Sequence, residues 1–237
     1  MGILIVGLII GLIPPIILYK WILKNIEDEK FKEISKKSFK NGIIAVFPVL
    51  FTSIVLSLIG FIGLRRVNPL LYQFYYTFIA LAFAEELVKF LVFKHIIKKN
   101  DYKYSWFDLI IVMTLVGLGF ECIETVVMAL NANIMVMIIR GISLGHAGYG
   151  FIMGWFYGKM EKTGKKIYGV LSFLIPLILH GLYDFGLSPV LIELNENFAI
   201  ISVLLEVVCL VCVVLIVRFI KKRKDTDIYR EPLESFK

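Results

Sequence analysis

Long apolar runs, separated by short charged segments, constrain this chain more than any other feature of its sequence. Each run is roughly 20 residues long, the length that an α-helix needs to cross a hydrocarbon core of about 30 Å. Seven runs can be distinguished, at 2–19, 41–64, 69–93, 106–130, 133–158, 167–187 and 198–220. Backbone polar groups must find partners within a bilayer, and a helix pairs them inside the segment itself. The sequence therefore predicts an all-α fold, a polytopic membrane bundle of about seven transmembrane helices.

The composition supports this class of protein. Hydrophobic residues make up 59% of the 237 residues and charged residues 19%, whereas soluble domains are about 45–50% apolar and about 25% charged. An ordinary soluble core is therefore excluded, and so is a disordered chain, which requires low hydrophobicity. Cys122, Cys209 and Cys212 all lie in apolar runs, so the sequence predicts no disulfide framework.

The distribution of basic residues predicts the orientation of the spans. Alternate loops and the C-terminal tail contain 22 Lys and Arg residues, and the opposite loops contain two, Arg65 and Arg66. Because basic residues accumulate on the cytoplasmic side, we expect cytoplasmic basic loops and C-terminus, an outside N-terminus and a cell-membrane location. These basic loops account for the net charge of +7, so the charge does not indicate a nucleic-acid partner. The first span lacks a cleavage site, which favours a retained helix over a signal peptide, and 20–40 is either an interfacial helix or a charged loop.

Ionisable residues at membrane depth are the unusual feature of these spans. Each costs roughly 2.5–3.5 kcal/mol at the bilayer centre on insertion scales, so such residues are functional candidates by default. Two histidines, His146 and His180, also lie near the middle of their spans. The charged candidates are the acids Glu85, Glu86, Glu121, Glu124, Asp184 and Glu206 and the bases Lys89 and Arg140.

Helical spacing groups the first of these residues. Glu85 and Lys89 are four residues apart and share a helix face, whereas Glu86 lies about 100° round the helix and can face another neighbour. Glu121 and Glu124, three residues apart, project to one side of the fourth span. Small residues permit close helix contact within a bilayer, and the glycines near these groups are Gly117, Gly119, Gly150, Gly154 and Gly158.

The histidines belong to the next two spans. His146 is expected about thirteen residues into the fifth span, at a depth similar to that of His180 in the sixth. His180 and Asp184 are four residues apart, so the carboxylate can orient the imidazole. Four consecutive antiparallel helices would bring carboxylates and imidazoles to one level. Arg140 can snorkel to the outer surface, and Glu206, without a partner in its own helix, is not included in the predicted site.

Four motifs on consecutive spans resemble those of a known family. They are EExxK at 85–89, GxGFExxE at 117–124, Arg140 with His146 and the glycines of 150–154, and HGLYDF at 180–185. Together they resemble the PrsW-type family of intramembrane proteases, related to the CAAX-prenyl-protease-like and bacteriocin-processing membrane enzymes. Thr125 stands where the family pattern leads us to expect Asn. We expect a single integral-membrane domain over 1–237, with a catalytic core at about 69–187 and a cytoplasmic tail at 221–237.

The resemblance implies hydrolysis of a peptide bond in or near a transmembrane segment of a single-pass regulatory protein such as an anti-sigma factor. This reaction needs an activated water, a stabilised oxyanion and a proton for the leaving amine. Glu85 or Glu86 would take the proton from water, while Lys89 holds the pair in position. The histidines would polarise the carbonyl or bind a metal. The predicted catalytic residues are Glu85, Glu86, Glu121, Glu124, His146, His180 and Asp184, with Lys89 and Arg140 in support.

The sequence leaves the metal and one other function class open. No HExxH helix occurs, yet Glu124, His146 and His180 could bind Zn²⁺ with water in the fourth position. Alternatively, buried Glu and His residues could form the relay of a proton- or cation-coupled transporter or channel. The lack of paired inverted repeats disfavours that class, and a non-catalytic scaffold would leave the buried acids unexplained.

Overall fold

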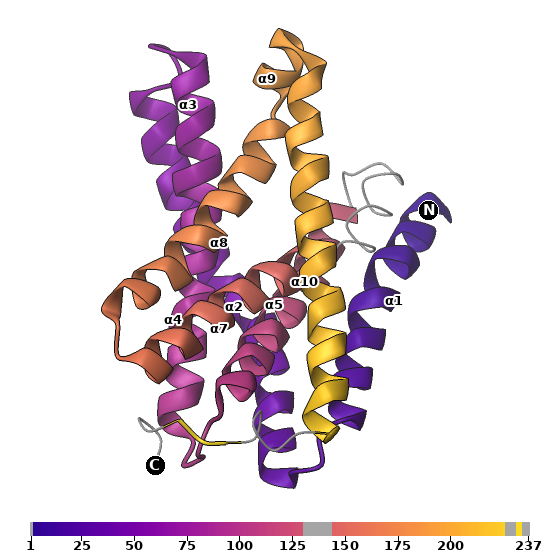
Figure 1. The fold of residues 1–237 in the computed structure, drawn as a ribbon. Coiled ribbons are helices and arrows are strands. Elements are labelled where there is room, and N and C mark those ends of the chain that lie inside the picture. The colour runs from indigo at the N-terminus through magenta and orange to yellow at the C-terminus, as the bar shows by residue number, and fades with distance from the viewer. Residues whose placement is uncertain (1, 130–143, 226–230, 234–237) are drawn as a thin grey trace.

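The computed structural model describes residues 2–129, 144–225 and 231–233, and every regular element within them is a helix. This confirms the predicted all-α class (Figure 1). The elements are α1 (Gly2–Lys24), α2 (Glu29–Gly63), α3 (Pro69–Tyr75), the π-helical segment η1 (Tyr76–Phe83), α4 (Ala84–Lys99), α5 (Trp106–Ala129), α7 (Gly145–Thr163), α8 (Lys166–Gly186), α9 (Pro189–Leu194), the short η2 (Glu196–Phe198) and α10 (Ala199–Asp225).

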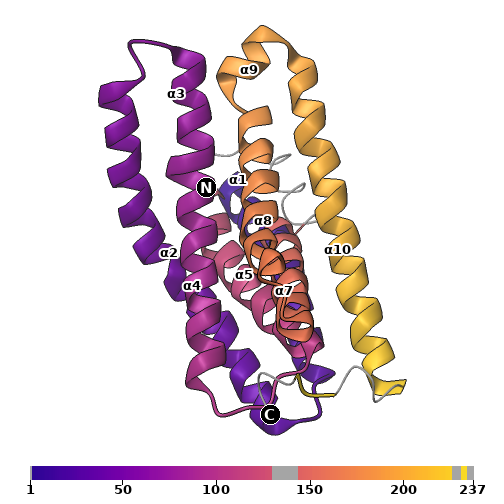
Figure 2. The same cartoon turned by 60° about the vertical axis from the view of Figure 1, so that its left-hand side comes forward.

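Helix α5 lies at the centre of the bundle and is buried on nearly every side. It packs against α7, α2 and α1, and α7 in turn packs against α8 and α10 (Figure 2). Within the described residues, four helices are long and apolar enough to cross a membrane: α2, α5, α8 and the segment Glu196–Lys222. The protein is therefore a multi-helix membrane protein.

The third predicted span forms one uninterrupted helical run from α3 through η1 to α4. Its middle section, Tyr76–Phe83, is π-helical and ends directly before Glu85 and Glu86. Wider turns of this kind are rare and are frequent at functional sites. The extra residue in each turn changes the side of the helix on which the two glutamates emerge.

The start of α7 corrects the predicted position of His146. Leu144 has a left-handed backbone (φ 50°), and α7 begins at Gly145, so His146 lies in the first turn of this helix. A β-carbon makes this left-handed conformation costly, and it interrupts a continuous right-handed helix. His146 is level with His180 as predicted, since the two ring centroids are 5.2 Å apart. The remainder of the predicted fifth span, including Arg140, lies outside the described residues.

Residues 20–40 are helical except for a short turn, which agrees with the helical alternative and not with the loop. Only a turn at 25–28 separates α1 from α2, and the charged segment after it continues directly into the apolar part of α2. The carboxylate of Asp28 accepts a hydrogen bond from the backbone N–H of Phe31 (2.8 Å), which caps the helix. Phe31 and Ile34 are buried, so one face of this charged segment packs against the bundle.

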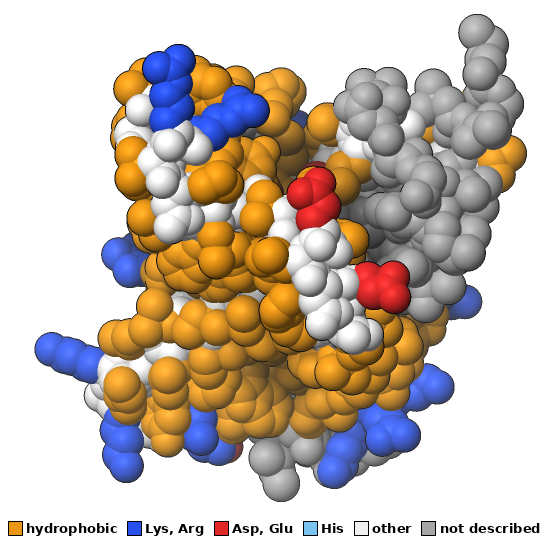
Figure 3. Space-filling model, turned by 90° about the horizontal axis from the view of Figure 1, so that it is seen from above, with side chains coloured by type: hydrophobic (Ala, Val, Ile, Leu, Met, Phe, Trp, Pro, Cys, Tyr) orange, Lys and Arg blue, Asp and Glu red, His pale blue; other side chains and the backbone are white. Residues whose placement is uncertain are grey.

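The two ends of the bundle differ in charge. The α1–α2 turn, the α4–α5 loop and residues 231–233 lie at one end (Figure 1), and the N–H of Leu233 donates to the carbonyl of Tyr104 there (2.9 Å). The opposite end, seen in Figure 3, is largely apolar with few charged side chains. Two of the predicted basic segments, the one that contains the α1–α2 turn and the α4–α5 loop, thus lie at the same end.

Glycines allow α5 and α7 to approach closely. A β-carbon on Gly117 would overlap the backbone carbonyl of His146. Similarly, a β-carbon on Gly150 would lie 2.6 Å from the carbonyl oxygen of Met113, nearer than real contacts allow. The predicted packing role of these glycines is confirmed at this interface, and the contact of Gly117 holds the backbone of His146 against α5.

We expect Gly117→Ala to destabilise the protein by about 1–3 kcal/mol, the usual cost of forcing a methyl group into a packed interior. The measurement is thermal or denaturant unfolding of the purified protein in detergent micelles. Gly63→Ala is the matched control, because a β-carbon there meets nothing within 4 Å. Equal stability of the two variants would show that the α5–α7 contact tolerates a wider separation.

Candidate active site

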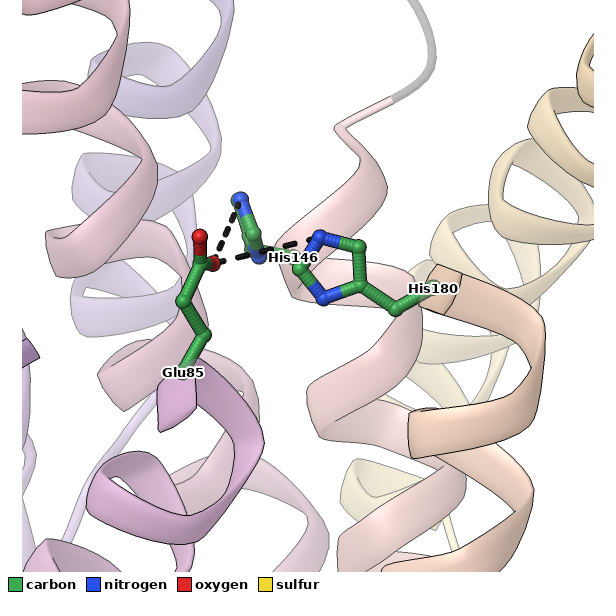
Figure 4. A group of neighbouring side chains, drawn as sticks. All are labelled: Glu85, His146 and His180. Atoms are coloured by element: carbon green, nitrogen blue, oxygen red, sulfur yellow. Dashed lines mark ion pairs between the residues drawn. The ribbon is translucent and has the colours of Figure 1, made fainter. Parts of the chain in front are cut away.

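A buried cluster forms where α4, α7 and α8 meet (Figure 4). Glu85, His146 and His180 each contribute one potential ligand atom, and these three atoms lie within 4.8 Å of one another. Oε2 of Glu85 is 3.9 Å from Nε2 of His146 and 3.9 Å from Nε2 of His180. All three side chains are buried. Two imidazoles and a carboxylate from three separate helices therefore converge on one point.

Glu86 orients His180 through a hydrogen bond to its ring. Its Oε1 accepts a hydrogen bond from Nδ1 of His180 (2.9 Å) and another from Nζ of Lys89 (2.7 Å). A carboxylate bound to Nδ1 places the ring proton there and leaves Nε2 with a lone pair. That Nε2 is the atom nearest Glu85 and lies 3.4 Å from Oδ2 of Asp184. Glu86 thus acts through His180, and Asp184 lies beside the reactive nitrogen.

Lys89 links the two acids to the other histidine. Its buried ammonium donates to Glu86 and to Nδ1 of His146 (2.8 Å), and it lies 3.6 Å from Oε2 of Glu85. The group also sits 4.6 Å above the ring of Phe120, a cation–π contact that stabilises it. The predicted Glu85–Lys89 pair is present, but the ion pair between Glu86 and Lys89, three residues apart, is closer.

Glu121 and Glu124 of α5 hold His146 from the other side. The backbone N–H of His146 donates to Oε2 of Glu121 (3.1 Å). N–H groups in the first turn of a helix have no partner within the helix, so Glu121 caps α7 inside the protein. Glu124 bonds through Oε2 to Nε2 of His146. Because the Lys89 ammonium can only donate, Nδ1 of His146 accepts and its Nε2–H donates to Glu124.

Two further residues border the site that sequence reasoning did not include. The ring of Tyr149 stacks on His180, with centroids 5.1 Å apart and an angle of 19° between the planes. Glu206 of α10 lines a small cavity together with His146 and His180. Tyr149 stands three residues after His146, on the same helix face, and Glu206 is an acid at membrane depth. Those were the signals available in the sequence.

Comparison with known proteins supports an enzymatic role for this cluster. The model of the PrsW family, described as intramembrane metalloproteases, matches residues 35–217. The chain belongs to this family. The match covers all the helices that contribute to the cluster and confirms the resemblance inferred from the four motifs. The description of the family agrees with the expectation of a membrane-embedded peptidase.

Several curated relatives of the family are similar to the chain. Each is called Protease PrsW: that of Geobacillus kaustophilus is 30% identical over 152 residues, which is 62% of this chain and 64% of the relative. The Halalkalibacterium halodurans relative is 30% identical over 70% of this chain and 74% of its own, and that of Bacillus subtilis is 27% identical over 75% and 81%. The alignment thus spans slightly less than two thirds of the Geobacillus protein. No solved structure matches the chain.

The family is described as metalloproteases, and the residues present fit a metal. Two imidazoles and a carboxylate form a common catalytic zinc set, with a fourth position open to water. Glu85, His146 and His180 supply this set, whereas Glu124, our predicted third ligand, bonds to His146. A metal on Nε2 of His146 would require the ring proton on Nδ1, so the ammonium of Lys89 would have to leave that atom.

Proposed function

We propose that this chain hydrolyses a peptide bond in or near a transmembrane segment of a membrane protein. The convergence of Glu85, His146 and His180 in the interior of an apolar bundle is the observation that supports this proposal. A membrane bundle without such a function would fold more easily with apolar residues at these positions. Family membership supplies the reaction class, and the buried cluster supplies groups suited to it.

The side chains divide into metal-holding, positioning and proton-transferring groups. Glu85, His146 and His180 would hold a metal ion, Zn²⁺ in our proposal, which when bound would polarise a carbonyl or water. Of the neighbouring carboxylates, Glu124 bonds directly to His146 and has a side chain 22% exposed, against 10% for Glu85. We assign Glu124 to take a proton from the attacking water and return it to the leaving amine.

The remaining predicted residues support this arrangement. Glu86 orients the ring of His180, Lys89 donates to Glu86, and Asp184 lies beside Nε2 of His180. Glu121 caps α7 and so places His146. Arg140 stays a predicted supporting residue.

The proposal extends to topology and substrate. Seven spans follow from the seven apolar runs, and an outside N-terminus with cytoplasmic basic loops and tail follows from the distribution of Lys and Arg. In this arrangement 1–237 is one membrane domain, with its core at 69–187 and its tail at 221–237. A single-pass regulatory protein is the substrate we propose, since its one helix can reach a site inside the bundle from the bilayer.

Proteolysis and ion transport give different results in one experiment. The purified chain is reconstituted in liposomes with single-pass membrane proteins from its own source cells. We expect cleaved fragments that disappear with a chelator and return with zinc, because the proposed site needs its metal. His180→Ala should abolish cleavage, and His95→Ala, an exposed histidine outside the cluster, should not.

The same liposomes measure proton and cation flux. Flux that depends on His180, without cleavage of any membrane protein, would overturn the protease proposal in favour of a transporter. Chelator-resistant cleavage would retain the protease and exclude the proposed metal.

A further inference from the structure

Helix α10 adds an acidic side chain to the site, and the register between α10 and α7 determines its position. The position of a β-carbon on Gly145 is 4.0 Å from Oε2 of Glu206, and a β-carbon on Gly148 would touch Cα and Cβ of Cys209. From the first pair to the second, the residue number rises by three in both helices. Helices α7 and α10 therefore run in the same direction here and contact each other along one face. Glu206 therefore lies at the first turn of α7, at the level of His146.

The cavity at this level connects Glu206 with the two histidines. Its lining residues are Glu121, Gly145, His146, Tyr149, His180, Tyr183 and Glu206. Glu85 of α4 is not among them, whereas Glu206 of α10 is. The ring of Tyr149, which stacks on His180, forms part of the cavity wall. A group bound in the cavity would meet both imidazoles and Glu206.

The carboxylate of Glu206 in the cavity wall is suited to accept hydrogen bonds from N–H groups of a substrate. A substrate helix must unwind before hydrolysis, and the freed backbone N–H groups then need partners in a low-dielectric interior. Oε2 of Glu206 is shielded from solvent, and a hydrogen bond to a charged acceptor is stronger than one to a neutral acceptor. Its place at membrane depth, where a carboxylate is costly, is then explained by substrate binding.

We propose that Glu206 is a substrate-positioning residue that accepts a hydrogen bond from a backbone N–H of the unwound substrate segment, within the cavity beside the histidines. The inference rests on the proposed protease function. It assigns α10 a part in substrate binding and leaves metal binding to the residues of α4, α7 and α8.

The test uses the reconstituted chain and the membrane proteins described above. We expect Glu206→Leu to lower kcat/KM for fragment formation about 10- to 100-fold, mainly through KM, the usual effect of losing a hydrogen bond to a charged acceptor. Glu206→Gln retains an oxygen acceptor without the charge and should recover part of this loss. Glu196→Gln removes an exposed acid ten residues earlier and should behave as the wild type.

Zinc content per chain is measured in parallel, because a structural defect would change it. Unchanged zinc content with raised KM supports the inference. Wild-type kinetics for Glu206→Leu would overturn it while the protease function stands. Loss of zinc, or a lower kcat with the same KM, would place Glu206 in the metal site or in folding and would also overturn it. If the wild type cleaves nothing, the proposed function fails and the inference fails with it.

Discussion

Replacing Glu85 by Gln is expected to lower the rate of peptide-bond hydrolysis by about 10²–10⁴-fold, a loss typical of removing an essential acid–base or ligand group. Glu85 is the carboxylate that lies 3.9 Å from both Nε2 atoms. Glutamine retains the shape of the side chain but is a much weaker metal ligand, so zinc content should fall together with activity. Both quantities are measured on the purified protein in liposomes.

The control for this variant is Glu193→Gln, since Glu193 is an exposed acid near the end of α9. Its activity and zinc content should equal those of the wild type. A Glu85→Gln protein that loses activity but retains its zinc would identify Glu85 as a general base and transfer the ligand role to another residue. Full activity would exclude Glu85 from the reaction.

Replacing Lys89 by Met is expected to destabilise the protein by about 3–5 kcal/mol, the cost of removing one partner of a buried ion pair. The ammonium of Lys89 is bonded to Glu86 and His146 in the interior. Without it, Glu86 is a buried carboxylate with less compensation. The free energy of unfolding in detergent micelles measures the effect.

A second substitution tests whether charge is the cause. The double variant Lys89→Met with Glu86→Gln should regain part of the lost stability, because no uncompensated carboxylate then remains at Glu86. Lys98→Met, on the exposed end of the same helix, should be nearly neutral. If the double variant is no more stable than Lys89→Met alone, the loss comes from packing and not from charge.

Much of the candidate site could be predicted from the sequence because bilayers penalise charge. The acids of 85–86 and 121–124, together with His146 and His180, stood out only against apolar surroundings. Spacing along a helix then indicated which residues share a face, as for Glu85 with Lys89. These are local properties of one helix, so a linear sequence contains them.

Contacts between helices could not be predicted in the same way. Glu124 was expected to complete a metal site, but the structure pairs it with His146 and directs Glu85 toward both histidines. Which neighbour a side chain meets depends on the rotation and depth of each helix. The left-handed Leu144, which makes His146 the second residue of α7, also has no signal in hydropathy.

By itself, the sequence determined the all-helical membrane class, the family and the set of ionisable residues at membrane depth, since each depends on the chemistry of one segment in an apolar solvent. Only the tertiary structure decided which of those residues meet. It placed Glu86 on His180, Glu121 at the start of α7, and Glu206 in the cavity that the two histidines also line. The physical reason is that close packing at Gly117 and Gly148 sets the register between neighbouring helices. Register depends on two helices together, so it cannot be found in the sequence of either helix alone.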